Sequence, residues 1–399
     1  MRVRKIKLSL LLAPALAMLS PAAAQAWAPL SWPIGNAELT LAGEAGGALF
    51  DPRQPGWSSS QTNETGASGV VLFKPSLRRD YDTGLSLGID GRIALADPLS
   101  RGRYDGDAIE RLAATARTGL GKFEIGIADG AGYALAVTGP KVDAGVSLED
   151  PRTSFYRDPS TGRAVIGMFA LRTAAGASSN YAKFVYTSPS LFGVTVALSF
   201  APTQGKQLPF LNAGPHRAGG QADFWEAALR YETEIGALSL TGTGAVSESR
   251  GEHKLPGQEG TSDISFGLRG DYPLTDEIKL SFGGSWRQSN AYGFDIGQTW
   301  QASTTRGQYA SAALSKGDWT LGFEYGNGVA KEVAIAGLPR LGLNGAQAAL
   351  GYRLSPSVDV STGYQHLNYG RGSGAFFNGG RQLEMEAVFL HLNIHTSQE

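Results

Sequence analysis

The chain has 399 residues, with 36 acidic and 35 basic side chains and a formal net charge of −1. This balance excludes the basic footprint that nucleic-acid binding requires, so no nucleic-acid partner is predicted. The absence of cysteine excludes disulfide bonds, thiolate metal sites and cysteine nucleophiles.

Residues 1–26 have the composition of a secretory signal. Four basic residues within 2–7 precede an apolar run over 8–19, and the alanines within 22–26 provide small residues for cleavage. A membrane anchor is the alternative, but this run is shorter than the roughly 20 residues of a spanning helix. We therefore expect an exported protein whose residues 27–399 form one domain. Within it, 27–36 is predicted to be an arm that precedes the first strand.

From residue 37 onward, about sixteen segments of roughly ten residues alternate between apolar and polar side chains, which is the period of β-strands. In 85–95, Leu87 and Ile89 share one face while Asp90 and Arg92 share the other. The same alternation occurs over 225–231, 264–272, 278–287 and 319–325.

The connections between these segments alternate between long and short. Seven tight turns are expected near 82–84, 119–121, 188–193, 235–237, 275–277, 316–318 and 355–357. Eight long links are expected near 51–65, 97–107, 130–178, 202–222, 249–262, 289–304, 327–343 and 370–381.

This asymmetry distinguishes a membrane barrel from other all-β folds. A soluble sandwich also alternates, and a propeller shares the spacing, but neither requires long links at one end and tight turns at the other. In hydrocarbon, every backbone polar group needs a partner, so a sheet spans only when it closes. The sequence therefore predicts an all-β fold: a transmembrane antiparallel β-barrel of about sixteen strands, with both chain ends on the short-turn side.

A barrel of this width keeps water in its interior. The polar, glycine-rich faces are predicted to line that lumen, and Glu384 and Glu386 are expected to face it as lumen carboxylates. Aromatic residues at the segment ends suit the two membrane interfaces. The longest link, about 129–179, carries many charges and would narrow the lumen if it folded inward.

Several stretches resemble the Gram-negative trimeric general porins, especially the alphaproteobacterial type. They are the first strand over 39–45, the turn and strand over 81–88, the strand over 121–126 that leads into the third loop, and the strand over 180–189 that follows it. The resemblance implies a homotrimer in the outer membrane, in contact with membrane lipid and lipopolysaccharide. It also implies a third loop that folds into the lumen, with acidic loop residues opposite a basic wall.

Carried onto this sequence, the resemblance gives two sets of candidate residues. The register of the fourth strand stays open, and the loop also carries basic residues, so a purely acidic loop is not expected. The candidate constriction residues in the loop are Asp143, Glu149, Asp150, Arg152, Arg157 and Asp158. The candidate wall residues are Lys74 and Arg92, which point inward by alternation, with Arg111 or Arg117.

The function that the resemblance implies is passive diffusion of small hydrophilic solutes and ions through a water-filled channel. A channel biased toward sugars, phosphate or carboxylates is the first alternative, and a barrel enzyme or adhesin is the second. The five histidines lack metal-ligand spacing, and no nucleophile elbow occurs. The sequence therefore predicts no catalytic residues, no metal and no cofactor.

Overall fold

The computed structural model describes residues 28–53, 65–96, 109–142, 146–149, 173–176, 178, 181–203, 221–251, 260–290, 304–331, 341–369 and 383–396. The expected signal segment 1–26 lies outside them. None of the helices in these residues is long and apolar enough to cross a membrane. The helix described is α2 (Ala131–Ala134), and the strands are β1 (Leu30–Ile34), β2 (Ala37–Arg53), β3 (Gly66–Asp80), β4 (Ser86–Ala96), β5 (Ile109–Thr118), β6 (Gly121–Ile127), β7 (Ala182–Thr187), β8 (Val194–Thr203), β9 (Gln221–Ile235), β10 (Leu238–Gly251), β11 (Ser262–Pro273), β12 (Ile278–Ser289), β13 (Thr304–Lys316), β14 (Trp319–Lys331), β15 (Leu341–Ser355), β16 (Val358–Tyr369) and β17 (Leu383–His395).

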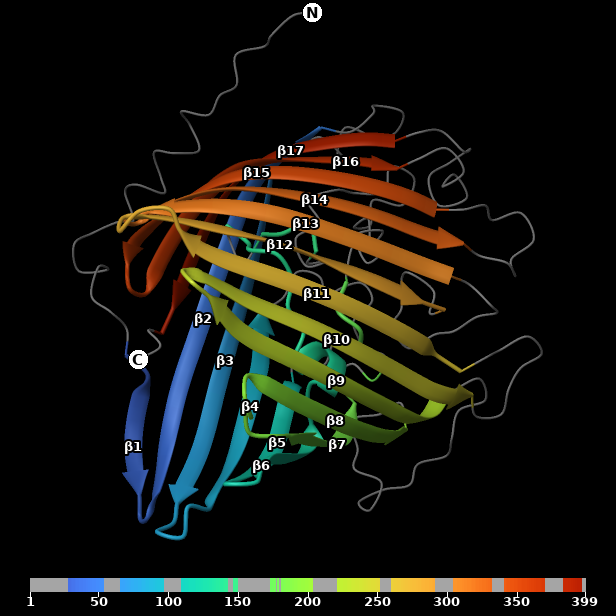
Figure 1. Ribbon diagram of the computed structural model, residues 1–399. Coiled ribbons are helices and arrows are strands. Elements are labelled where there is room, and N and C mark those ends of the chain that lie inside the picture. The colour runs from blue at the N-terminus through green and yellow to red at the C-terminus, as the bar shows by residue number, and fades with distance from the viewer. Residues whose placement is uncertain are drawn as a thin grey trace, which may run out of the picture.

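Strands β2 to β17 form a closed antiparallel barrel of sixteen strands (Figure 1). Each strand pairs with the next one along the chain, and β17 returns to pair with β2, which places Phe389 opposite Phe50. Closure leaves these strands without a free edge, as a sheet in hydrocarbon requires. The predicted fold class and strand number are confirmed.

Strand β1 corrects the expected N-terminal arm. Residues 30–34 form a strand that is antiparallel to the beginning of β2, with Trp32 opposite Leu39. Pro33 argues against a strand in the sequence because it lacks an N–H donor, but proline is tolerated in edge strands. β17 pairs with residues 44–53 of β2, and β1 pairs with residues 37–41 on the same edge of β2.

The links follow the predicted alternation. Tight turns join β3 to β4, β5 to β6 and each later pair up to β15 and β16, while the strand ends that the longer links join lie at the opposite end of the barrel. Gly193 and Gly236 adopt positive φ angles of 82° and 62° within these turns, a conformation that glycine reaches without strain. The expected long and short ends are confirmed.

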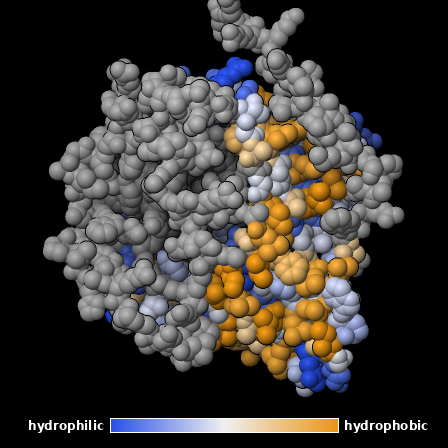
Figure 2. All heavy atoms as spheres, turned by 180° about the vertical axis from the view of Figure 1, so that it is seen from behind, coloured by the Kyte–Doolittle hydropathy of each residue, from blue (hydrophilic) through white to orange (hydrophobic). Residues whose placement is uncertain are grey.

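Side-chain burial is inverted relative to a soluble protein. On β11 and β14, Phe266 and Phe323 are exposed on the outer face, while Asp263 and Glu324 are buried on the inner face. Figure 2 shows hydrophobic residues gathered over one side of the outer surface, with hydrophilic residues at its lower end. The strands therefore direct apolar side chains outward, toward lipid, and polar side chains inward.

Candidate functional site

The third loop, between β6 and β7, lies along the inner wall and doubles back on itself. Its outgoing arm, described over 131–142 and 146–149, touches the strands from β8 to β15 in turn. Its returning arm, described over 173–176 and at 178, touches β12, β11 and β9. We call the inner face of β8–β15 the loop-bound wall. The contacts include Ala131 N to Ser199 Oγ (3.0 Å), Val137 N to Thr243 Oγ1 (3.3 Å), Gln347 Nε2 to the Val146 carbonyl (3.0 Å) and Ala175 N to Ser265 Oγ (3.1 Å).

Glu226 on β9 holds both arms of the loop. One oxygen of its carboxylate accepts the Gly132 N–H at 3.1 Å, and the other accepts the Ser178 N–H at 2.9 Å. The side chain is almost completely buried. Because loop amides have no partners in regular secondary structure, a buried carboxylate is a strong acceptor for them.

Glu324 on β14 holds the far end of the outgoing arm. Its Oε2 accepts the Ser147 hydroxyl at 2.8 Å and the Leu148 N–H at 3.0 Å. Gln347 on the neighbouring strand donates to the other oxygen at 3.3 Å. The carboxylate is therefore a structural acceptor for the loop and is not free in the lumen.

Asp263 on β11 anchors the returning arm and forms a buried ion pair. Its carboxylate accepts the Gly176 N–H at 3.3 Å and pairs with Arg287 on β12, with Nη2 at 2.7 Å and Nε at 2.8 Å. The Asp263 side chain is 0% exposed and that of Arg287 is 7% exposed. A buried guanidinium needs such a partner, because an unpaired buried charge is very costly.

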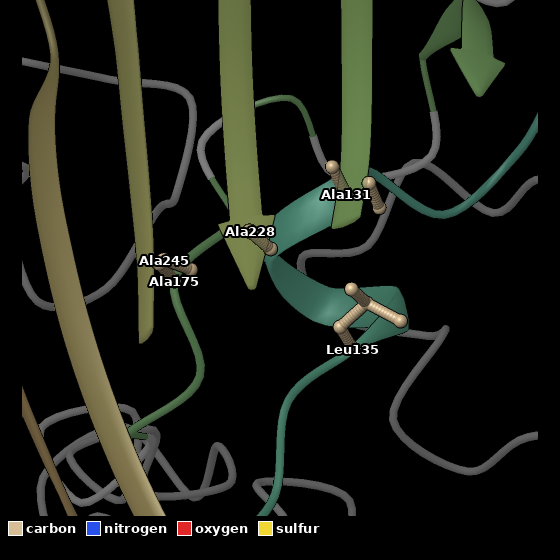
Figure 3. Packing of buried hydrophobic residues seen from close by; sticks show 6 residues of the cluster. Ala131, Leu135, Ala175, Ala228 and Ala245 are labelled. Atoms are coloured by element: carbon tan, nitrogen blue, oxygen red, sulfur yellow. The ribbon is translucent and has the colours of Figure 1, made fainter. Parts of the chain in front are cut away.

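Small residues make room for the loop. A Cβ on Gly267 would overlap the Val137 carbonyl, and a Cβ on Gly322 would overlap the Val142 side chain. Because these wall glycines have no side chain, the loop can pack closely against the inner face of the strands. Figure 3 shows the same principle around α2, whose buried apolar cluster consists of Ala131, Leu135, Ala175, Ala197, Ala228 and Ala245.

The opposite part of the inner face, on β2–β6, carries accessible charged residues, and we call it the open wall. Arg92 on β4 lies directly opposite Arg111 on β5 in the strand register. Asp129, where the third loop leaves β6, bridges the two guanidinium groups at 3.3 and 3.4 Å. Glu110 pairs with Arg92 at 2.8 Å, and Glu124 pairs with Arg111.

Two further basic residues of the open wall are paired as well. Lys74 on β3 binds Glu44 on β2 at 2.8 Å, and Lys122 binds Glu124 at the same distance. Lys183 on β7, beside the open wall, is completely buried and donates to Ser178 Oγ at 2.7 Å. Lys74, Arg92, Arg111 and Lys122 are therefore balanced by acidic groups of the wall itself.

Of the six predicted loop residues, five lie outside the described residues: Asp143, Asp150, Arg152, Arg157 and Asp158. Glu149 is buried in the loop, where it accepts the Thr173 N–H at 3.2 Å and lies 3.5 Å from Lys141 Nζ. It links the outgoing arm to the returning arm.

The four predicted wall residues all lie on the inner side of their strands. Lys74 and Arg92 occupy the alternate positions of β3 and β4 that the polar residues share. The open question about β5 is answered by the register, which pairs Arg111 with Arg92 and Arg117 with Ser86, after an irregularity beside Arg92. Their role in selecting solutes stays a prediction.

Glu384 and Glu386 correct the expectation of lumen carboxylates. They share a face of β17 with Leu390 and Leu392, which is the outer face, and the side chain of Glu386 lies opposite His366 of β16, 3.9 Å from its Nδ1. The error arose because two acids spaced by two residues indicate a shared face but not which face. Only the apolar partners further along the strand show that this face points outward.

Sequence reasoning missed the acidic anchors Glu226, Asp263 and Glu324, and the bridging Asp129. All four were visible as inward positions or as the first residue of the loop. Nothing in one sequence, however, shows which inward acid meets a loop amide 90 or more residues away, as the Glu226–Gly132 bond requires.

A closed barrel with a polar interior, an apolar exterior and a loop packed along its inner wall defines a transmembrane channel of the outer-membrane type. The chain belongs to the Gram-negative porin family, whose model matches residues 11–372. It is an outer-membrane channel for passive diffusion of solutes, as its family and barrel both indicate.

Solved structures share the fold at low identity. The outer-membrane channel DcaP of Acinetobacter baumannii is 9% identical with a TM-score of 0.57, covering 92% of this chain and 99% of that one. The anion-selective porin from Comamonas acidovorans is 14% identical, with a TM-score of 0.54 and 90% and 99% coverage. The trimer form of OmpT of Vibrio cholerae is 11% identical, with a TM-score of 0.51 and the same coverage. No curated protein matches the chain.

Proposed function

We propose that this porin is a general diffusion channel for small hydrophilic solutes and ions, with its passage between the third loop and the open wall. The observation that carries the proposal is that the described residues of the third loop from 131 onward pack against one side of the barrel. The loop occupies β8–β15, whereas Lys74 and Arg92 on the open wall keep 40% and 28% of their side chains exposed. Lys74, Arg92, Arg111 and Arg117 are then the wall residues that a passing solute meets.

The charge balance of the open wall supports weak ion selectivity. Fixed charges along a channel bias which ions pass. Here Asp129, Glu110 and Glu124 neutralise the paired arginines, so no strong field of one sign remains at this wall. A channel without such a bias suits mixed solutes better than one class of anion or cation.

The experiment is conductance of the purified protein in planar bilayers under a salt gradient. Conductance that rises linearly with voltage and salt, with a small zero-current potential, supports a general channel. Saturating conductance that one sugar, phosphate or carboxylate blocks would instead support the substrate-biased alternative.

Asp129→Asn tests whether the passage runs beside the paired arginines. Removing one negative charge leaves Arg92 and Arg111 less compensated, so the zero-current potential is expected to shift toward anion preference. Asp271→Asn is the matched control, because Asp271 also pairs with an arginine of the inner face, Arg269, but lies on β11. Equal shifts in the two variants would contradict the proposed position of the passage.

We also propose that the protein is a homotrimer that joins through the outer face of β2–β4. The outer positions of β2 include Gly43, Ala45 and Gly47, and those of β4 are aliphatic or glycine. The outer face of β6–β14 is instead rich in the aromatic residues that suit lipid interfaces, such as Phe123, Trp225, Tyr231, Tyr272, Trp319 and Tyr325. The trimer form of OmpT, a protein of the same fold, supports this assembly.

Gly47→Trp tests the trimer face, because a bulky side chain there would prevent close contact between copies. The variant is expected to migrate as a monomer in an unheated gel. Gly244→Trp on the outer face of β10 adds the same side chain in the lipid-facing region and is expected to stay trimeric.

The outward charged residues at the outer end of β16, β17 and β2, including Glu386, His366 and Arg53, then lie at the level of the lipopolysaccharide headgroups.

A further inference from the structure

The tight turns at the periplasmic end expose large apolar side chains on one part of the rim. Four consecutive hairpins carry them, those of β5–β6, β7–β8, β9–β10 and β11–β12. Since β6 pairs with β7, β8 with β9 and β10 with β11, these turns follow one another around the barrel. We call this set the apolar turn arc: Leu120, Leu191, Phe192, Ile235 and Leu274.

The other turns at this end differ in composition. The β3–β4 turn contains Asp82 and Thr83, and the β13–β14 turn consists of Gly317 and Asp318. Polar and glycine residues are what tight turns ordinarily use. Among the turns that join consecutive barrel strands, the exposed apolar side chains are therefore concentrated in the part of the rim below the aromatic-rich outer wall. Strand β1 exposes a separate apolar group, Leu30, Trp32 and Ile34, beside the start of β2.

Phe192 is the least expected residue of the arc. Its φ angle is +53°, in the left-handed region that residues with a Cβ disfavour, and its side chain is fully exposed at 101%. Glycine or asparagine would satisfy that backbone without strain. The turn thus keeps a phenylalanine that neither its backbone nor its packing within the chain requires.

The arc extends beyond the tyrosines that mark the membrane interface. Ile235 lies four residues past Tyr231 on the same face of β9, or about 13 Å along the strand. The Tyr186 hydroxyl donates to the Leu120 carbonyl at 2.8 Å, which ties the tip of one turn to the interfacial aromatic of the next strand. The apolar surface of the wall therefore continues to the tips of these turns.

We propose that the apolar turn arc inserts into the phospholipid headgroup layer of the inner leaflet. Isolated apolar side chains that project from neighbouring loops suit an interfacial lipid layer, where each one inserts separately. A protein partner needs a contiguous patch of roughly 1,000 Å² in all, which single side chains on separate turns do not provide. The arc is also continuous with the lipid-facing wall.

The chain contains no cysteine, so a single introduced cysteine labels one position. Phe192→Cys and Leu120→Cys report on two separate turns of the arc, and Thr83→Cys and Asp318→Cys are the controls on polar turns. Each variant is labelled with a polarity-sensitive fluorophore and reconstituted in phospholipid vesicles with iodide on both sides. A second set of vesicles carries headgroup nitroxide lipids. Heat-modifiable gel mobility confirms that each barrel is folded.

Both arc positions are expected to show blue-shifted emission, weak quenching by iodide and strong quenching by the headgroup nitroxide. Both control positions are expected to show unshifted emission, strong quenching by iodide and weak quenching by the nitroxide. Iodide quenching at the arc equal to that at the control turns would overturn the proposal. Protection of the arc fluorophores from iodide that appears only after a periplasmic protein is added would overturn the proposal too, in favour of a protein partner. The readout does not depend on conductance, so it is separate from the tests of the passage.

Discussion

The two sides of the inner wall use the same residue types for different purposes. On the loop-bound wall, Glu226 and Glu324 are buried and accept hydrogen bonds from loop amides. On the open wall, Glu44 and Glu110 stay partly exposed and pair with basic residues of adjacent strands. An inward carboxylate is therefore structural where the loop covers it and electrostatic where water reaches it.

The largest expected effect is on the loop-bound wall. Asp263→Ala leaves Arg287 buried without a counter-ion, and breaking such a pair costs about 3–5 kcal/mol. The temperature at which the folded barrel loses its compact gel mobility should fall markedly. Asp271→Ala removes the partner of the more exposed Arg269, where a pair contributes about 0–1 kcal/mol, and should change little. An equal fall in this temperature in both variants would show that the loop does not bury the Asp263 side chain.

Glu324→Gln is the next test, because it weakens the attachment of the loop and leaves the barrel intact. Hydrogen bonds to a charged group contribute about 1.5–3 kcal/mol, and the amide offers Ser147 and Leu148 only a neutral acceptor. Its NH2 group would also replace the oxygen that accepts from Gln347 Nε2. The loop end should loosen, which we expect to raise conductance noise and the uptake of larger sugars in liposome swelling. Glu234→Gln, an exposed acid near the periplasmic end of β9, is the control. An unchanged sugar size limit in Glu324→Gln would mean that this anchor does not position the constriction.

The fold was predictable because its signals are local and repeated. Alternation along each strand and the contrast between tight turns and long links determine a closed barrel before any contact is known. The inward direction of Lys74 and Arg92 followed from the same period of two. β1 was missed because it is only five residues long and contains Pro33.

The site was less predictable because it depends on contacts between distant segments. Whether Glu226 faces a solute or a loop amide is decided by the path of the third loop, which no spacing encodes. For Glu386, the period indicated a shared face but left its direction ambiguous. Charge type alone also failed to separate Arg92, which Asp129 holds, from Arg117, whose partners in the strand register are the neutral Ser86 and the basic Lys122.

Arg117→Gln gives the smallest expected effect and sharpens the comparison on the open wall. The side chain is exposed near the periplasmic end of β5, so water and salt screen its charge. Its loss should shift the zero-current potential slightly toward cations at about 0.01 M salt, where the Debye length is about 30 Å, and not at 1 M, where it is about 3 Å.

Arg92→Gln is the matched variant for this prediction, because Arg92 lies beside Asp129 on the same wall. Its loss exposes the negative charges of Glu110 and Asp129 as well, so the shift toward cations should be larger and should persist at higher salt. A larger shift from Arg117→Gln than from Arg92→Gln would place the selective step at the periplasmic mouth. The paired arginines would then serve mainly to hold the stem of the third loop against the wall.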